Sequence, residues 1–293
     1  MTVLQDLAIV TLIVAVIFIL WYLFITSCLW TCLAKSPTFI LLFSQAINDV
    51  YALTQSLWQC IIQLAGIKNK SYLPNRWLSI IHGSFELISL PHYFVIALNR
   101  GLFLIDHTKM NHVFDTRTTV IICILMYIIP VLANVLLHVF AEDDDEGFYL
   151  FHSDTLEMGG KSSGFGDASY ISTVFDWSFY LTVVIVVVTY VLAIVWHSYK
   201  KRAFSLSTTT GFFTPATANI CMEMRLTIVC LVNLVPPTIT TILEYAWTDR
   251  DLVGSFVFAL LTISDNAINA VVLPLCSQLL RDCVKKRILS TIV

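Results

Sequence analysis

Charged residues are scarce in this sequence. Only 13% of its 293 residues are Asp, Glu, Lys or Arg, whereas a soluble domain carries about 25%. Hydrophobic residues make up 57% of the chain, and its mean hydropathy is +0.80. This composition excludes an ordinary soluble protein and is typical of a membrane protein. We therefore expect membrane lipids, and no nucleic acid, among its partners.

Catalytic motifs are also lacking. The sequence contains no Gly-x-Ser-x-Gly and no His-Glu-x-x-His pattern, which are the spacings that serine hydrolases and zinc proteases need. Asp49 and Asp265 do not form a Gly-flanked acidic pair. We expect no enzyme activity and no cofactor. The segment Met1–Asp6 has no Lys or Arg, so it does not resemble the start of a cleaved signal peptide.

Apolar stretches fill most of the chain. A hydrocarbon core of about 30 Å requires roughly 20 apolar residues in a helix. Seven stretches meet this length, at Leu7–Leu33, Thr38–Gly66, Trp77–Ile105, Thr118–Phe140, Ile171–His197, Cys221–Tyr245 and Leu252–Cys276. The predicted fold class is an all-α membrane protein: a single seven-transmembrane helix bundle over residues 1–293, with a short amphipathic helix at 277–290.

The distribution of basic residues predicts the orientation of the bundle. If the N-terminus lies outside, the cytoplasmic segments hold 12 of the 17 Lys and Arg residues and the outer segments hold 5. Basic residues are enriched on the cytoplasmic side of membrane proteins. We therefore expect the N-terminus outside and the C-terminus inside. The sequon at Asn69 then lies in an outer loop, where it is a candidate for glycosylation.

The predicted outer loops contain no cysteine. All eight Cys residues lie in predicted spans or on the cytoplasmic side, so no extracellular disulfide framework is expected, and no spacing suggests a metal site. Most of them are interpreted as small buried hydrophobes. Cys283 is the exception, because it lies in a basic segment just after the last span. It is a candidate site of palmitoylation.

The longest predicted outer loop, Ala141–Ser169, is strongly acidic. It begins with five consecutive acids at residues 142–146. Adjacent like charges repel and stay hydrated, which favours a disordered, solvated loop. The alternative is that their field concentrates cationic ligands near the mouth of the bundle.

Polar residues recur at helical spacing inside three predicted spans. The second span carries Gln45, Asn48, Asp49, Gln55, Gln59 and Gln63; the third carries His82, Glu86, Ser89, Tyr93 and Arg100; the seventh carries Thr262, Asp265, Asn266 and Asn269. Steps of three and four residues place such groups on one helix face, and lipid cannot satisfy them. They are either hydrogen-bonding links between helices or functional groups.

His82 and Glu86 are one helical turn apart in the outer half of the third span. They are predicted to contact a ligand, and a structural ion pair is the alternative. Pro91 and the pair Pro236-Pro237 interrupt the hydrogen bonding of their spans, so we expect bends there.

Three fragments occur in an order that resembles rhodopsin-like receptors. SQAINDVYAL at Ser44–Leu53 is similar to their second span, IALNRG at Ile96–Gly101 to the end of their third, and SDNAINAVVLPLCSQLLR at Ser264–Arg281 to their seventh span and following helix. In its compact loops and its Ala-Leu-Asn-Arg motif, the chain is most similar to nematode serpentine chemoreceptors, of class x or a neighbouring class. Asn99 and Gly101 differ from the acid and the aromatic that flank the Arg in that family.

The resemblance implies a G-protein-coupled chemosensory receptor in the plasma membrane of a sensory cell. Its partners would be a small-molecule or peptide ligand and a heterotrimeric G protein. Ligand contacts are expected at His82, Glu86, Asp176, Glu244 and Tyr245. Activation and coupling residues are expected at Asp49, Asn99, Arg100, Asn266 and Asn269, with an internal sodium ion as a possible occupant near Asp49.

Two other classes stay open at this point. Polar stripes also line the pathways of small transporters and channels, although the two halves of this chain show no repeat. A divergent receptor homologue that no longer signals would show the same topology with altered motifs. Ligand-dependent solute or ion flux in the absence of G protein would indicate a transporter or channel. A chain that shows neither flux nor G-protein activation would fit the non-signalling homologue.

Overall fold

The computed structural model describes residues 3–65, 72–140, 149–151, 158–160, 167–205, 230–247 and 252–292. These residues are helical except for short connections and one pair of three-residue strands. The helices and strands are α1 (Val3–Trp30), η1 (Leu33–Lys35), α2 (Pro37–Leu64), α3 (Tyr72–Ile105), α4 (His107–Val113), α5 (Thr116–Phe140), β1 (Tyr149–Phe151), β2 (Met158–Gly160), α6 (Asp167–Ser205), α8 (Val235–Ala246), α9 (Leu252–Cys276) and α10 (Gln278–Ile292).

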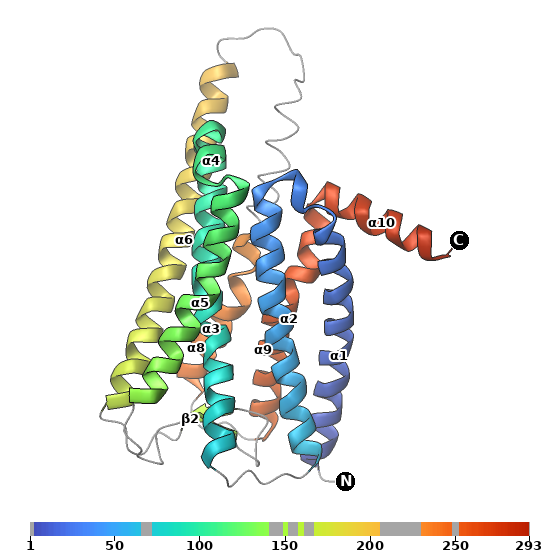
Figure 1. Ribbon diagram of the computed structural model, residues 1–293, viewed down its shortest axis with the longest axis vertical. Helices are drawn as coiled ribbons and strands as arrows, with labels where there is room; N and C mark the ends of the chain where they lie inside the picture. Colours follow the sequence, from blue (N-terminus) through green and yellow to red (C-terminus); the bar gives the residue numbers. More distant parts are fainter. Residues whose placement is uncertain are drawn as a thin grey trace.

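The long helices lie side by side in a bundle (Figure 1). The N-terminus lies at one end of the bundle, whereas α9 ends at the other, where α10 turns away to the side. The end of α1, the start of α2, and α4 lie at the same end as α10. We call this the α10 end. A helix follows the last predicted span, at Gln278–Ile292, and its amphipathic character stays a prediction.

Four helices are long and apolar enough to cross a membrane: Val3–Trp30, Leu87–Ile105, Thr116–Leu136 and Leu252–Cys276. Tyr180–Trp196 and Cys230–Thr240 form shorter apolar helical stretches. The chain therefore has the helices of a membrane protein. The second predicted span, α2, is not among the four because its amides and Asp49 lower its hydropathy, and the first part of the sixth predicted span lies outside the described residues.

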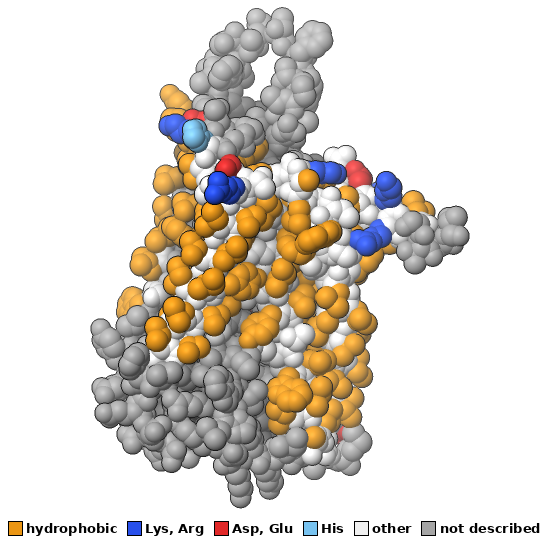
Figure 2. Space-filling model, viewed as in Figure 1, with side chains coloured by type: hydrophobic (Ala, Val, Ile, Leu, Met, Phe, Trp, Pro, Cys, Tyr) orange, Lys and Arg blue, Asp and Glu red, His pale blue; other side chains and the backbone are white. Residues whose placement is uncertain are grey.

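The surface of the bundle is divided by residue type. Large apolar side chains of α1, α5 and α6 are exposed along the middle of the bundle, and they form the orange band in Figure 2. Blue Lys and Arg side chains gather at the α10 end. An apolar band bordered by basic residues at one end is the pattern that a membrane and an anionic inner leaflet favour.

Three helices at the α10 end begin with a side-chain cap. The Ser36 hydroxyl accepts a hydrogen bond from Thr38 N–H before α2, with Pro37 in the first turn. Asp106 and Asp115 carboxylates accept from the backbone N–H groups of Lys109 and Thr118 at 3.2 and 2.8 Å. Such caps accept hydrogen bonds from the first N–H groups of a helix, which have no acceptor within the helix. The bonds from the Thr118 side chain and backbone hold the pKa of Asp115 below its ordinary value.

Gly101 marks the closest approach of α3 to α6. A Cβ placed on Gly101 would lie 2.8 Å from Cγ2 of Thr189, well inside van der Waals contact. Nearby, Ala97 of α3 and Val186 and Tyr190 of α6 pack together as buried residues. The absence of a side chain at residue 101 therefore lets the two helices pack closely there.

Gly101→Ala is expected to lower the stability of the folded bundle by about 1–2 kcal/mol. Overpacking costs about 1–3 kcal/mol, and the better helix propensity of Ala returns up to about 1. Thr189 is stiff because it is β-branched, so it cannot easily turn away. The midpoint of thermal unfolding, measured by size-exclusion chromatography in detergent, should fall. The double variant with Thr189→Ser, which lacks the clashing methyl, should recover; a fall that persists in it contradicts this explanation.

The structure differs from the sequence prediction in two places. The acidic outer loop was expected to lack structure, but Tyr149–Phe151 and Met158–Gly160 pair as antiparallel strands. Helix α6 continues to Ser205, eight residues beyond the predicted end of the span at His197. The interruption expected at the Pro236-Pro237 pair is present, because Asn233 and Leu234 form a turn and the Pro pair lies in the first turn of α8.

Candidate functional site

Asp49 lies near the middle of α2 and is almost completely buried. Its carboxyl group accepts hydrogen bonds from three side chains. The Tyr22 hydroxyl of α1 donates to Oδ2, Gln45 Nε2 of α2 donates to Oδ1 at 2.6 Å, and Asn269 Nδ2 of α9 donates to Oδ2 at 2.9 Å. A buried carboxyl group is costly unless such donors surround it. Asp49 thereby links three helices.

The network continues beyond Asp49. Asn233, in the turn before α8, donates from Nδ2 to Oδ1 of Asn269. Asn269 therefore uses its amide group to donate to one helix and its carbonyl oxygen to accept from another segment. We call Tyr22, Gln45, Asp49, Asn233 and Asn269 the Asp49 network. It joins residues that are up to 247 positions apart in the sequence, from Tyr22 to Asn269.

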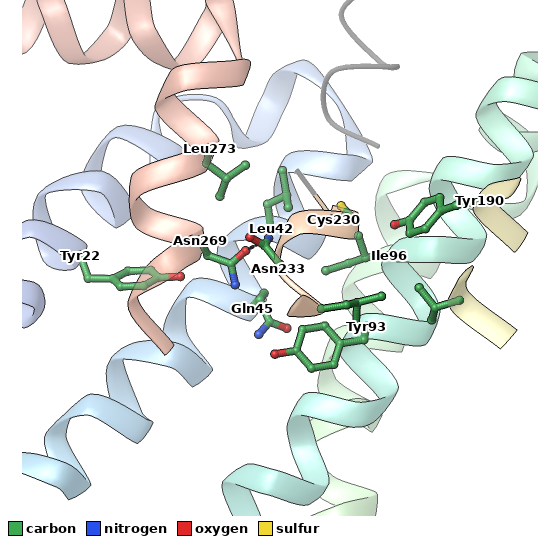
Figure 3. Close-up of a pocket in the computed structure, with 12 residues that line it drawn as sticks. Tyr22, Leu42, Gln45, Tyr93, Ile96, Tyr190, Cys230, Asn233, Asn269 and Leu273 are labelled. Atoms are coloured by element: carbon green, nitrogen blue, oxygen red, sulfur yellow. Dashed lines mark hydrogen bonds between the residues drawn. The ribbon is translucent and has the colours of Figure 1, made fainter. Parts of the chain in front are cut away.

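A small cavity lies beside the Asp49 network (Figure 3). About 20 Å³ of it is open to the centre of a water molecule. One water needs about 10–15 Å³ on this measure, so the cavity has room for about one water molecule. Its lining is formed by Tyr22, Leu42, Gln45, Tyr93, Ile96, Val186, Tyr190, Cys230, Asn233, Leu234, Asn269 and Leu273.

Two amide carbonyl oxygens at this cavity lack a hydrogen-bond partner among the described residues. They are Oε1 of Gln45 and Oδ1 of Asn233, both buried on residues that line it. Buried carbonyl oxygens without partners carry a desolvation cost. A water molecule in the cavity could donate to such oxygens. Asp49 itself is not among the residues that line the cavity, but its hydrogen-bond partners Tyr22, Gln45 and Asn269 are.

Asn99 and Arg100 form a second buried polar group in α3. They are 0% and 1% exposed. Thr38 Oγ1, in the first turn of α2, donates to Oδ1 of Asn99 at 2.9 Å. The Arg100 guanidinium lies within electrostatic reach of Cys230 and of Tyr190 on α6. Tyr190 and Cys230 also line the cavity, so the cavity lies between the Asp49 network and Arg100.

His92 links α2, α3 and α5. Its Nδ1–H donates to the carbonyl oxygen of Ile88 at 2.8 Å, which leaves Nε2 to accept from the Ser44 hydroxyl at 2.8 Å. Its ring packs edge-on against Tyr127 at 5.3 Å, and the Tyr127 hydroxyl donates to the Ser44 carbonyl at 2.6 Å. These bonds fix the neutral tautomer of His92 and make the residue a structural link.

The structure brings some of the predicted activation residues together and leaves Asn266 apart. Asp49 and Asn269 are joined directly, and Asn99 and Arg100 lie next to each other on α3. Asn266 is buried on α9, but its Nδ2 donates to the Thr262 carbonyl of its own helix at 2.8 Å. Asn266 thus bonds within its own helix there, and no direct bond between it and Asp49 is seen.

The predicted ligand contacts stay predictions. His82 and Glu86 lie in α3, Asp176 in α6, and Glu244 and Tyr245 in α8, but their side chains are outside the described part of the structure. The same holds for Asn69, which lies between α2 and α3. Cys283 is described: its Sγ lies 3.5 Å from Sγ of Cys32. Palmitoylation of Cys283 is not tested by this contact.

Among the residues that sequence reasoning missed are Tyr22, His92 and Asn233. Asn233 had a usable signal, because it is an amide within the apolar run Cys230–Val235, and such groups seldom face lipid. Tyr22 had a weaker sequence signal, because Tyr residues in membrane spans are common near the lipid–water interface and do not by themselves indicate a buried site. His92 had a signal as well, because it lies three residues after Ser89 of the polar stripe in its span.

Comparison with known proteins adds no family assignment. No family model matches the sequence, and no curated protein matches it either.

Proposed function

We propose that this chain is a seven-transmembrane, G-protein-coupled chemosensory receptor of the plasma membrane, oriented with its N-terminus outside. A small extracellular ligand would contact His82, Glu86, Asp176, Glu244 and Tyr245, and a heterotrimeric G protein would bind at the α10 end. The observation that supports this most is the Asp49 network, because it joins α1, α2 and α9 at one buried carboxyl group and reaches the segment before α8 through Asn269.

Such a network suits a two-state bundle. Its members come from α1, α2, α9 and the segment before α8, so a movement of α9 or of that segment must exchange hydrogen bonds at Asp49 and at Asn269. Packed interiors change between discrete arrangements rather than deforming smoothly. A ligand that binds one arrangement more tightly shifts the population towards it. The cavity between Asp49 and Arg100 gives the side chains room for this exchange.

The direct test is a G-protein activation assay in cells that express the tagged chain at their surface. It uses a broad panel of odorants and peptides. A ligand-dependent response supports the receptor function and defines the ligand class. Silence at confirmed surface delivery, together with solute or ion flux in proteoliposomes without G protein, would contradict it and favour a transporter or channel.

The resemblance to rhodopsin-like receptors also predicts a dependence on sodium. We expect NaCl, compared with choline chloride at equal ionic strength, to raise the thermal midpoint of the purified protein, because an ion on Asp49 stabilises the state that binds it. The increase should disappear in Asp49→Asn. An equal effect of sodium on wild type and Asp49→Asn would contradict a site at this carboxylate and leave water as the occupant.

A further inference from the structure

Two cysteines from opposite ends of the sequence meet at the α10 end. Cys32 follows α1 and precedes η1, whereas Cys283 lies in α10. Their Sγ atoms are 3.5 Å apart although the residues are separated by 251 positions. Both are free thiols.

This contact is part of the docking of α10 on α1 (Figure 1). The Thr31 hydroxyl donates to Sγ of Cys283 at 3.8 Å. One turn further along α10, Arg287 Nη1 donates to the carbonyl oxygen of Ser27 at 2.8 Å. The α10 helix is therefore held on the end of α1 by a charged hydrogen bond and by the thiol pair, and the pair has a fixed place in the fold.

The two thiols differ in access. Cys32 is 0% exposed, whereas Cys283 is partly exposed. Burial raises the pKa of the Cys32 thiol to about 11, so little of it is thiolate at neutral pH. Because the thiolate is the reactive form and oxidants arrive from solvent, Cys283 is the residue that an oxidant meets first and Cys32 is the one that follows.

We propose that Cys32 and Cys283 are a redox-sensitive pair, which a peroxide converts into a disulfide that fixes α10 to the end of α1. In the first step the Cys283 thiolate attacks one oxygen of hydrogen peroxide; the O–O bond breaks, Cys283 becomes a sulfenic acid and hydroxide leaves. In the second step the Cys32 thiolate attacks the Cys283 sulfur, the S–O bond breaks and a second hydroxide leaves. Two thiols and one peroxide thus give one disulfide and two waters.

The two sulfur atoms need to move only a short distance to form this disulfide. A disulfide has its sulfurs about 2.05 Å apart, so the two Sγ atoms have to approach by roughly 1.5 Å, which a small side-chain rotation can supply. Under the proposed orientation the pair faces the cytoplasm, where glutathione and thioredoxin keep thiols reduced. The bond is then a transient, reversible state of the protein, and its formation does not depend on the receptor function.

The test uses the purified full chain, treated with hydrogen peroxide, blocked with N-ethylmaleimide and digested for mass spectrometry. We expect a linked Cys32–Cys283 peptide as the main disulfide, forming faster as the pH rises from 7 to 9. It should be lost in Cys32→Ser and in Cys283→Ser. It should persist in Cys276→Ser, a partly exposed cysteine at the end of α9, and in Cys28→Ser, a buried neighbour.

Three outcomes would overturn the proposal: oxidation of Cys283 to sulfinic acid with Cys32 still free, a main disulfide that joins Cys283 to Cys28, or recovery of Cys283 from cells as a fatty-acid thioester. Peptide mapping of the wild-type protein decides among these even if a variant fails to fold. As a second measurement, amide hydrogen exchange in α10 should slow after oxidation and recover with dithiothreitol in wild type. Unchanged exchange in oxidised wild type would contradict the fixing of α10.

Discussion

Arg100→Ala is expected to abolish ligand-dependent G-protein activation while the receptor still reaches the cell surface. Arg100 lies five residues before the end of α3 at the α10 end, which is the cytoplasmic side under the proposed orientation. Its guanidinium is enclosed in the bundle near Tyr190 of α6 and Cys230. A charge held there must move outward to meet a G-protein helix, and only a rearrangement of α6 or of the segment before α8 can release it.

The loss of charge has to be separated from the loss of packing. Arg100 is the largest of the fully buried side chains among the described residues, and replacing a large buried side chain by Ala costs about 2–5 kcal/mol through the cavity it leaves. Arg100→Gln keeps most of the volume and removes the charge. We expect this variant to lose activation as well, with a smaller loss of stability.

The matched control is Arg117→Ala. Arg117 is an exposed cation in the first turn of α5, at the same end of the bundle. Its removal should change stability by no more than about 0.5 kcal/mol and should leave most of the activation. Normal ligand-dependent activation in surface-expressed Arg100→Ala and Arg100→Gln would refute the coupling role of Arg100.

The helices were predictable from the sequence because their cause is local. Continuous apolar runs predict helices wherever lipid is the solvent. Each predicted stretch contains described helical residues, and four described helices are long and apolar enough to cross a membrane. Their ends were less predictable. Caps at Ser36, Asp106 and Asp115 fix where helices begin, but the extension of α6 to Ser205 depends on the helix continuing outside the apolar stretch, for which hydropathy carries no signal.

The candidate site was partly predictable. Helical spacing identified Gln45, Asp49 and Asn269 as inward-facing polar residues, and the structure joins all three. Spacing within one helix cannot say which residue of another helix completes a hydrogen bond. Tyr22 and Asn233 were missed for this reason, since each stands alone among apolar neighbours and gains its meaning only from packing against α2 or α9.

Asp49→Ala is expected to be the most destabilising single change in the Asp49 network. It removes the acceptor of three donors, from Tyr22, Gln45 and Asn269, and leaves them inside the bundle. Hydrogen bonds between membrane helices average about 0.6 kcal/mol each, whereas a stranded buried donor costs about 1–3 kcal/mol. The two figures bracket a loss of about 2–5 kcal/mol, because the cavity beside the network lets water reach some of the stranded groups.

Conservative variants show which interaction carries the effect. Asp49→Asn keeps the shape but replaces one acceptor oxygen by an NH₂ group. That group faces either the Gln45 donor, in the place of Oδ1, or the Tyr22 and Asn269 donors, in the place of Oδ2. Tyr22→Phe removes a donor and strands none, so it should cost only about 0.5–1.5 kcal/mol. Combined, the two changes should cost less than the sum of their separate effects, because each removes the same contact.

Thr54→Ala is the matched control on α2. Thr54 is exposed, and its hydroxyl donates only to the Tyr51 carbonyl of the same helix at 2.7 Å, so its loss should stay within about 0.5 kcal/mol. Thermal midpoints from size-exclusion chromatography and basal G-protein activation should be measured on the same preparations. If Asp49→Ala is as stable as Thr54→Ala, the three donors find other partners without this carboxyl group. The Asp49 network is then not the element that holds α1, α2 and α9 in one arrangement, and the two-state basis of the proposed signalling fails with it.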